Sequence, residues 1–278
     1  MSERAADGDR PRSPQMNPNQ QTHALACAVA AAQAAGKLMR PNLHATKTIN
    51  EATAHDIKLE LDVRCQKRIE RTLRRAFPEV AVLGEEGVSG DPEAAYRWVI
   101  DPIDGTVNFT YGIPHCCVSI ALQQRSPKSA PRYVTLVGVV YDPFCDEMFT
   151  AIRGQPARLN GRIIRASRRR TLGESIVSIG FAKNRATMRV GLPLFNKLIH
   201  RVRKVRMMGA AALGIAYVAS GRFDAYLEFG LRLWDIAAGG LILECAGGDF
   251  LHEPVAGEHT YRLVANNGHL RRRLEELR

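Results

Sequence analysis

The sequence lacks a long apolar run, and no stretch approaches the roughly 18 residues needed to span a bilayer. Its first 21 residues are rich in Pro, Asn, Gln and charged residues and contain no apolar segment typical of a secretory signal. The six cysteines form neither a Cys-x-x-Cys pair nor a zinc-binding spacing. These absences argue against a membrane span and a thiolate metal centre, and they predict a cytoplasmic protein with reduced cysteines.

Aromatic residues are scarce, at 6%, and basic residues outnumber acidic ones to give a net charge of +11. The basic residues gather at 162–170, 201–206 and 271–273. No aromatic residues interleave these clusters in the way that single-strand nucleic-acid binders use. A basic surface suits phosphorylated metabolites, nucleic acid or acidic proteins, and it is equally consistent with solvated arginine side chains.

Composition predicts a disordered tail at residues 1–21, followed by one folded domain at residues 22–278. Apolar spacing predicts helices at 23–39, 62–77, 190–202, 210–220 and 234–246. Strands are expected at 79–83, 96–100, 118–123, 133–141, 147–152, 175–178, 224–228 and 262–265. Asn160-Gly161 predicts a hairpin turn. Helices and strands in this mixed order predict a layered α/β or α+β domain.

The most informative segment is Trp98–Thr106, in which an apolar strand runs into Asp101 and Asp104 and then into Gly105-Thr106. Two carboxylates fixed at one strand end are costly unless a cation lies between them. The Gly-Thr step offers backbone N–H groups to an anion. A cation beside an anion indicates metal-assisted chemistry on a phosphate.

Three further acids stand where an element begins or ends: Glu85, Asp235 and Asp62. Each has a simpler interpretation when it is taken alone. Asp235 and Asp62 are suitable helix N-caps, and Glu85 is a suitable solvated turn residue. Two aspartates directly after a buried strand have little comparable structural use, so Asp101 and Asp104 carry the metal-site interpretation.

These residues resemble the motifs of the inositol monophosphatase family, on the segments Gly84-Glu85-Glu86, Trp98–Thr106 and Trp234–Gly239. The similarity continues through 209–212, 224–228 and 244–248, and it covers nearly all of the chain from His23 onward. The resemblance implies an αβαβα sandwich of the inositol monophosphatase and fructose-1,6-bisphosphatase type. It also implies a Mg²⁺-dependent, lithium-sensitive phosphomonoesterase that forms a homodimer.

The resemblance further implies roles for individual residues. Two Mg²⁺ ions would be held by four acids and one backbone carbonyl, from Glu85, Asp101, Ile103, Asp104 and Asp235. The attacking water would be oriented by Glu85 and Thr106, while Asp62 with Glu85 would support a third ion. The substrate would contact Asp104, Gly105, Thr106, Gly209, Ala210, Ala211, Glu228 and Asp235.

The chain departs from the family pattern at three places. Leu59 stands where a Thr is usual, Glu51 falls near the place of a common lysine with Lys47 as the nearest alternative, and Ala210 stands where a Thr is common. The first two concern the third ion, and the last removes a hydroxyl from the substrate rim. The expected substrate is therefore inositol-1-phosphate or a related polyol phosphate. The alternatives are fructose-1,6-bisphosphatase, histidinol-phosphatase or nucleotide 3′-phosphatase activity, or RNA or transcription-complex binding by the basic face.

Overall fold

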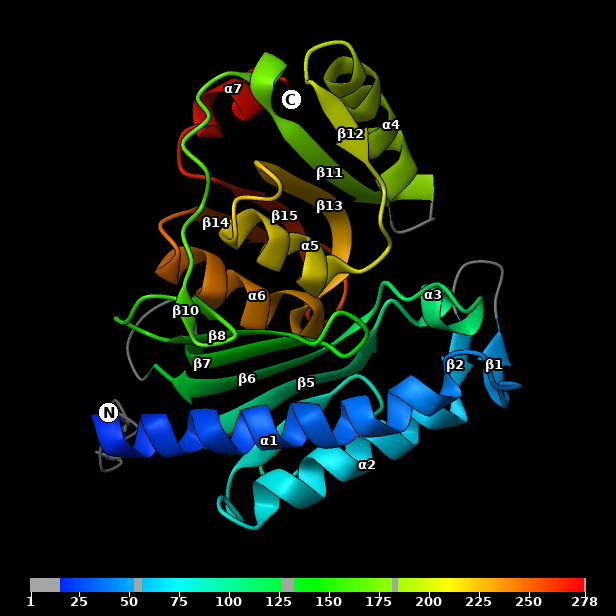
Figure 1. The fold of residues 1–278 in the computed structure, drawn as a ribbon, viewed down its shortest axis with the longest axis vertical. Helices are drawn as coiled ribbons and strands as arrows, with labels where there is room; N and C mark the ends of the chain where they lie inside the picture. The colour runs from blue at the N-terminus through cyan, green and yellow to red at the C-terminus, as the bar shows by residue number, and fades with distance from the viewer. Residues whose placement is uncertain (1–15, 53–56, 127–132, 182–184, 278) are drawn as a thin grey trace, which may run out of the picture.

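A computed structural model describes residues 16–52, 57–126, 133–181 and 185–277, arranged in five stacked layers (Figure 1). The helices in these ranges are α1 (Pro18–Asn42), α2 (Glu60–Arg74), α3 (Thr106–Thr110), α4 (Arg185–Ile199), α5 (Ala211–Ala219), α6 (Leu233–Cys245) and α7 (Arg271–Glu275). A single 3₁₀ turn, Leu172–Glu174, lies between α3 and α4 in this part of the chain. No described helix combines the length and the apolar character needed to cross a membrane.

The strands form two large sheets and one small pair. An eight-stranded sheet has the order β10-β9-β8-β7-β6-β5-β3-β4. Its strands are β3 (Ala81–Gly84), β4 (Gly87–Ser89), β5 (Tyr96–Asp104), β6 (Cys117–Arg125), β7 (Tyr133–Asp142), β8 (Glu147–Ile152), β9 (Arg158–Leu159) and β10 (Arg162–Ile163). Only β3 and β5 run parallel among these described strand pairs.

A five-stranded sheet has the order β12-β11-β13-β15-β14. Its strands are β11 (Ile176–Phe181), β12 (Lys204–Arg206), β13 (Ala225–Arg232), β14 (Asp249–Pro254) and β15 (Thr260–Asn266). The short strands β1 (Ile49–Ala52) and β2 (Ile57–Leu59) pair with each other beside α2. The order of layers is α1 and α2, the eight-stranded sheet, α5 and α6, the five-stranded sheet, and then α4 and α7 (Figure 1). This αβαβα arrangement is the one that the resemblance implied.

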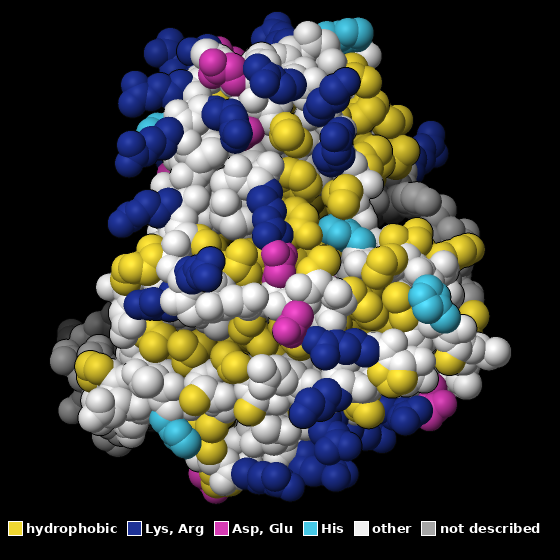
Figure 2. All heavy atoms as spheres, in the orientation of Figure 1, with side chains coloured by type: hydrophobic (Ala, Val, Ile, Leu, Met, Phe, Trp, Pro, Cys, Tyr) yellow, Lys and Arg dark blue, Asp and Glu magenta, His cyan; other side chains and the backbone are white. Residues whose placement is uncertain are grey.

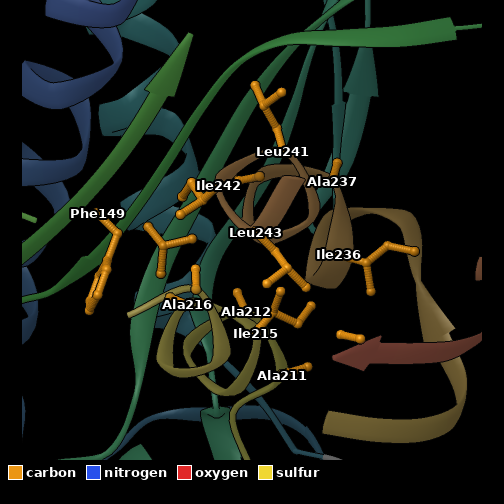
Figure 3. Packing of buried hydrophobic residues seen from close by; sticks show 14 of the residues in the cluster. Phe149, Ala211, Ala212, Ile215, Ala216, Ile236, Ala237, Leu241, Ile242 and Leu243 are labelled. Carbon is orange, nitrogen blue, oxygen red and sulfur yellow. The ribbon is translucent and has the colours of Figure 1, made fainter. Parts of the chain in front are cut away.

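Three apolar clusters hold the layers together. One lies between α1 and α2 and the eight-stranded sheet, and another joins the five-stranded sheet to α4 and α7. The third surrounds α5 and α6, where Ala212 and Ile215 of α5 lie close to Leu243 of α6 (Figure 3). Small residues allow this close packing: a Cβ on Gly239 of α6 would lie 3.1 Å from the Cβ of Ile215. The two central helices are therefore held firmly against both sheets.

The helix α1 begins earlier than the predicted helix at 23–39. Asn17 caps it by accepting a hydrogen bond from the Gln20 N–H at 3.0 Å, and Pro18 occupies the first helical position, where its missing N–H costs nothing. Pro18 to Gln21 are thus helical, and this end of the predicted disordered tail is corrected. The remaining tail, residues 1–15, lies outside the described residues.

The predicted hairpin turn at Asn160-Gly161 is confirmed between β9 and β10. Both residues have positive φ, 47° and 79°, the backbone region that Asn and Gly tolerate best. The strands β1, β2, β4, β12 and β14 were not predicted. The last two are edge strands with charged residues, and β14 ends in Pro254, so their sequences lack a clear strand pattern.

Candidate active site

Asp101 and Asp104 lie on the last part of β5, where the strand contains a bulge. Asp101 pairs with Ser119 of β6 and Asp104 pairs with Cys117, so three steps along β5 match two steps along β6. In a regular strand, residues three apart face opposite sides of the sheet, and the extra residue of a bulge returns them to one side. Asp101 and Asp104 are 2% and 7% exposed. The bulge therefore collects two buried carboxylates on one face.

Asp104 is hydrogen-bonded to the N-terminus of α5. Its Oδ1 accepts a hydrogen bond from the Ala211 N–H at 2.9 Å, and its Oδ2 accepts from the N–H groups of Ala212 and Leu213 at 2.8 and 3.4 Å. The N-cap residue of this helix is Ala210, whose methyl group cannot accept a hydrogen bond. Asp104 thus supplies from β5 the acceptor that the helix itself lacks. The cost of burying the carboxylate is partly offset by these bonds.

Glu85 and Asp235 approach the two aspartates from other elements. Glu85 follows Gly84 in the turn between β3 and β4, and its N–H donates to the Ile100 carbonyl of β5 at 3.1 Å. Asp235 is the third residue of α6, and its Oδ2 accepts from the Arg232 N–H at 2.7 Å. The backbone of Glu85 is therefore tied to β5, and the carboxylate of Asp235 is tied to the residue before α6.

The electrostatics join these acids into one group. Burial, followed by the charges of Glu85, Asp104, Asp235 and Asp62, raises the pKa of Asp101 well above its usual value. Burial and the charges of Asp104 and Glu85 likewise raise the pKa of Asp235. Burial raises the pKa of Asp104 to about 6, although the N–H groups of α5 act in the opposite direction. The arrangement concentrates negative charge at a buried place.

Asp62 is the third residue of α2 rather than its N-cap. It is 2% exposed, and its Oδ2 accepts from the Leu59 N–H at 2.8 Å. Leu59 is the N-cap and contributes no side-chain bond. The ammonium of Lys47 donates to the carbonyls of Leu43 and Ala45, at 2.7 and 2.8 Å, near the end of α1. Leu59 thus lies at the start of α2, and Lys47 is hydrogen-bonded to backbone carbonyls just after α1, whereas the Glu51 side chain lies outside the described part of the structure.

The chain passes from β5 into α3 through Ile103, the N-cap Gly105 and Thr106. The Thr106 hydroxyl donates to the Ile103 carbonyl at 2.9 Å. Gly105 is the N-cap with φ of 93°, and an added Cβ would lie 3.0 Å from the His115 carbonyl, so glycine suits this position. The backbone N–H groups at the start of a helix have no acceptor within the helix. This turn therefore presents N–H groups beside the acidic cluster.

The loop before α5 is tied to α3 by one side chain. Asn108 of α3 donates from its amide nitrogen to the carbonyls of His115 and Met208, at 2.9 and 2.7 Å. Gly209 follows with φ of 77°, a conformation that glycine adopts readily. Ala210, 2% exposed, then leads into α5. Asn108 thus ties the start of α3 to the loop that precedes α5.

Glu228 reaches the same region from β13. Its Oε2 accepts a hydrogen bond from the hydroxyl of Tyr226, two residues earlier on the same face of the strand. Burial raises the pKa of Glu228 to about 7, with the bond from Tyr226 acting in the opposite direction. A Cβ on Gly180 of the neighbouring strand β11 would clash with the Glu228 carboxylate. Tyr226 and Gly180 therefore define the position of this acid.

Several residues in this region were missed by sequence reasoning: Gln66, Asn108, Cys117, Ser119 and Tyr226. The spacing of Tyr226 and Glu228 on an apolar strand was a usable signal, because residues two apart share a face. The others act across strand or helix partners that are remote in sequence. Their contacts leave no local pattern to detect.

The donor set fits Mg²⁺ by its chemistry. Carboxylate and carbonyl oxygens are the ligands that this hard cation prefers. Burial and then neighbouring carboxylates raise the pKa values of both Asp101 and Asp235, and this excess of buried negative charge is what a cation would offset. Within the described ranges, no group of three or more His, Cys, Asp or Glu side chains is already gathered at metal-binding geometry. The acids of the cluster therefore have the chemistry that Mg²⁺ prefers and lie in one neighbourhood. The carboxylates of its four aspartates accept hydrogen bonds from backbone N–H groups.

A cavity of about 630 Å³ lies beside this cluster, between β3 to β7, α6 and β14 to β15. Leu83 and Ile236 line it, near Glu85 and Asp235 in the chain, but the acids themselves do not. Its other polar lining mixes acidic, basic and neutral groups, including Arg153 and Glu244, which pair at 2.9 Å. The cavity is therefore separate from the acidic cluster.

Comparison with known proteins places the chain in a family. The profile of the inositol monophosphatase family matches residues 20–277. A protein named Nus factor SuhB from Pseudomonas aeruginosa is 40% identical over 255 residues, which are 87% of this chain and 91% of that protein. Inositol monophosphatase 1 of Solanum lycopersicum is 36% identical, covering 89% and 91% of the two chains. The solved inositol monophosphatase from Anabaena has a TM-score of 0.79 and 36% identity, covering 93% and 96%. The chain belongs to the inositol monophosphatase family, and this membership supports a phosphatase function.

Proposed function

We propose that the protein is a Mg²⁺-dependent phosphomonoesterase that hydrolyses inositol-1-phosphate or a related polyol phosphate. The observation that carries the proposal is the convergence of Asp101, Asp104, Glu85, Asp235 and Asp62 from four separate parts of the fold. Five acids around a strand bulge, three of which have raised pKa values, are not needed in a purely structural site. Membership of the family supports the same assignment.

In this proposal Glu85, Asp101, the Ile103 carbonyl, Asp104 and Asp235 hold two Mg²⁺ ions, with Asp62 assisting a third. When bound, the ions supply Lewis-acid stabilisation of charge on the phosphate, the attacking water and the leaving oxygen. Asp101, whose pKa is raised by burial and by the charges of the other four acids, would take part in holding both ions.

The protein's own groups orient the reaction. Glu85 and Thr106 both accept hydrogen bonds from the attacking water and so aim it at phosphorus, in line with the departing alcohol. Thr106 is held for this role by its bond to the Ile103 carbonyl, 2.9 Å away. The N–H groups of Gly105 and Thr106 stabilise the phosphate oxygens as their charge grows. No covalent intermediate is required.

The alcohol is recognised from the opposite side, by Glu228 and by the turn through Gly209, Ala210 and Ala211. Ala210 lacks a hydroxyl, and the Ala211 N–H already donates to Asp104. Glu228 is therefore the principal group for selecting substrate hydroxyls in this proposal. The alternative substrates, namely fructose-1,6-bisphosphate, histidinol phosphate and nucleotide 3′-phosphates, differ in the hydroxyls and charges that this group meets.

A substrate panel tests the proposal. Phosphate release is measured from inositol-1-phosphate and the three alternatives, in Mg²⁺ and after chelation. The expected result is Mg²⁺-dependent release, highest for inositol-1-phosphate or another polyol phosphate, with inhibition by Li⁺. Absence of release from every compound in saturating Mg²⁺ would refute phosphatase function, and preference for an alternative would correct the substrate alone.

A second candidate function is binding to RNA or a transcription complex. One relative carries the name Nus factor, and the exposed side chains of Arg201, Arg203 and Arg206 lie at and beside the edge strand β12. Figure 2 shows Lys and Arg side chains far outnumbering Asp and Glu on one face of the molecule. RNA binding that weakens with salt and is lost in the triple Arg→Ala variant would support this function. Binding unaffected by that variant would contradict it.

We further propose a homodimer and a cytoplasmic location. Exposed apolar side chains near the candidate site, Val107, Tyr111, Ile113 and Met207, suit burial against a second copy. All six cysteines are free, which is compatible with a reducing compartment. The mass from gel filtration with light scattering tests the dimer, with a monomer as the contradicting outcome.

A further inference from the structure

Strand β6 pairs with β5, the strand that carries Asp101 and Asp104. Two polar side chains of β6 contact Asp104 itself and the helix that carries Asp235. Cys117 is the cross-strand partner of Asp104, and its Sγ lies 3.4 Å from Asp104 Oδ2 in a hydrogen bond. Ser119 is the cross-strand partner of Asp101, and its hydroxyl donates to the Trp234 carbonyl at 2.9 Å. Cys117 and Ser119 are two apart and so share one face of the strand. Both are essentially buried, at 0% and 1% exposure.

The hydrogen bonds at Asp104 distinguish its two oxygens. Oδ2 accepts from the Ala212 N–H at 2.8 Å, from the Leu213 N–H at 3.4 Å and from the Cys117 thiol. Oδ1 accepts only from the Ala211 N–H among its hydrogen bonds in the described residues. A carboxylate offers about four lone-pair sites, two on each oxygen. Oδ2 is therefore saturated, and Oδ1 keeps a lone pair for a ligand.

Ser119 acts on the other acid through the backbone. The Trp234 carbonyl that it contacts belongs to the residue before Asp235, in the first turn of α6. Asp235 is in turn bonded to the Arg232 N–H at 2.7 Å. Ser119 thus fastens the first turn of α6 to the sheet at the point from which Asp235 projects. The Cys117 thiol therefore holds the Asp104 carboxylate directly, and the Ser119 hydroxyl holds the backbone from which Asp235 projects.

We propose that Cys117 and Ser119 are positioning residues for the cation held jointly by Asp104 and Asp235, with Cys117 directing Asp104 to bind through Oδ1. This inference rests on the proposed function, because it concerns one of the two ions assigned there. Groups that orient metal ligands through hydrogen bonds commonly change metal affinity when they are removed. Neither residue touches the substrate or the reacting atoms.

The chain offers a matched control. Cys116 is the neighbour of Cys117, is also 0% exposed, and packs in the apolar cluster on the α1 and α2 side of the sheet. Cys116→Ala and Cys117→Ala each remove one sulfur atom, and the two positions are equally buried. Only the second removes a hydrogen bond to Asp104. Cys117→Ser retains a donor and serves as the conservative variant.

The experiment uses the full chain freed of metal and titrated with Mn²⁺, with free Mn²⁺ read by electron paramagnetic resonance. Because outer hydrogen-bond partners are worth about 10-fold or more in metal affinity, Cys117→Ala and Ser119→Ala are expected to weaken the second bound ion about 10-fold. Cys117→Ser and Cys116→Ala are expected to remain within about 2-fold of the unsubstituted protein, because neither loses the donor. The Mg²⁺ needed for half-maximal hydrolysis should shift in parallel, with the substrate KM at saturating Mg²⁺ unchanged.

Two results would overturn the inference: Cys117→Ala binding both ions as the unsubstituted chain does, or Cys117→Ser being as weak as Cys117→Ala. If thermal melting shows that Cys117→Ala does not fold, the Mn²⁺ affinity of Ser119→Ala tests the inference independently. An unsubstituted chain that neither binds Mn²⁺ nor releases phosphate would instead remove the proposed function, and this inference with it. The two failures are therefore distinguishable.

Discussion

The eight-stranded sheet and the five-stranded sheet both reach the candidate site, but they treat their acids differently. On the first, burial and then the charges of the surrounding carboxylates raise the pKa of Asp101. On the second, Glu228 has a protein partner, the Tyr226 hydroxyl, at the oxygen that faces Gly180. One side gathers negative charge, whereas the acid on the other side is hydrogen-bonded to a protein hydroxyl. In the proposed function, the first sheet would carry the reaction and the second would select the alcohol.

The largest expected effect comes from Asp101→Asn. This change removes the charge at the centre of the cluster while keeping its size. We expect phosphate release to fall by more than about 100-fold for every substrate, because a bridging ligand to both ions is lost. The measurement is kcat/KM at saturating Mg²⁺ across the substrate panel. Full activity in this variant would refute the assignment of the reaction to β5.

Glu228→Gln should act on the other side of the comparison. The loss of a buried charged hydrogen-bond acceptor is worth about 1.5 to 3 kcal/mol, or roughly 10-fold to 100-fold in KM for a polyol phosphate. A simple aryl phosphate, which offers no hydroxyls, should be hydrolysed at nearly the original rate. Equal losses on both substrates would show that the two sheets do not divide these tasks.

A pair of glycine substitutions provides a finer comparison. A Cβ at Gly84 would clash with the Gln66 side chain, which accepts from the Glu86 N–H at 2.9 Å next to Glu85. A Cβ at Gly180 would clash with Glu228. We expect Gly84→Ala to raise the Mg²⁺ requirement and Gly180→Ala to raise the polyol KM, each by about 3-fold to 10-fold.

Steady-state kinetics with Mg²⁺ and substrate varied in turn separates these two effects. Gly173→Ala is a suitable control, because an added Cβ there meets nothing within 4 Å and its φ lies outside the left-handed region. Reversal of the two effects would contradict the assignment of tasks to the sheets.

The smallest expected effect is on stability as a function of pH. Burial raises the pKa of Glu228 from an ordinary 4.5 to about 7, so between these values the folded chain holds a proton that the unfolded chain has lost. The free energy of unfolding of the metal-free protein therefore falls as pH rises from 4.5 to 7. Asp104, with its pKa raised to about 6, acts in the same direction. The Tm should drop across this window.

Glu228→Gln should reduce that drop by roughly 2 to 4 °C, because one contributing proton is removed. The exposed Glu258 provides the control variant Glu258→Gln, which should leave the drop unchanged. An identical pH dependence in both variants would contradict the buried environment assigned to Glu228. Melting is followed by circular dichroism at pH 5 and pH 7 in chelator.

The sequence alone was sufficient to predict the acids of the cluster and the layered class, because each acid stands beside a recognisable strand or helix boundary. Asp101 and Asp104 share one short motif, and the Asn160-Gly161 turn has a specific backbone requirement. The bulge that brings the two aspartates to one face could not be predicted. It depends on the register between β5 and β6, which no local pattern specifies.

The supporting contacts were beyond prediction for the same reason. Asn108 lies 100 residues before Met208, whose carbonyl it contacts. Cys117 reads as a small apolar residue in a strand, and only its pairing opposite Asp104 gives it a hydrogen bond. The capping of α5 by Asp104 was equally hidden, since N-cap residues are sought next to the helix that they cap.

Asp104 is fixed by protein groups, namely the N–H groups at the start of α5 and the Cys117 thiol. A side chain that is already immobile loses little conformational entropy when a ligand arrives. The same bonds also tie the N-terminus of α5 to the end of β5. Order in this part of the molecule is therefore supplied by the polypeptide itself, and in the proposed function a bound cation would add charge to a frame that the protein's own hydrogen bonds form.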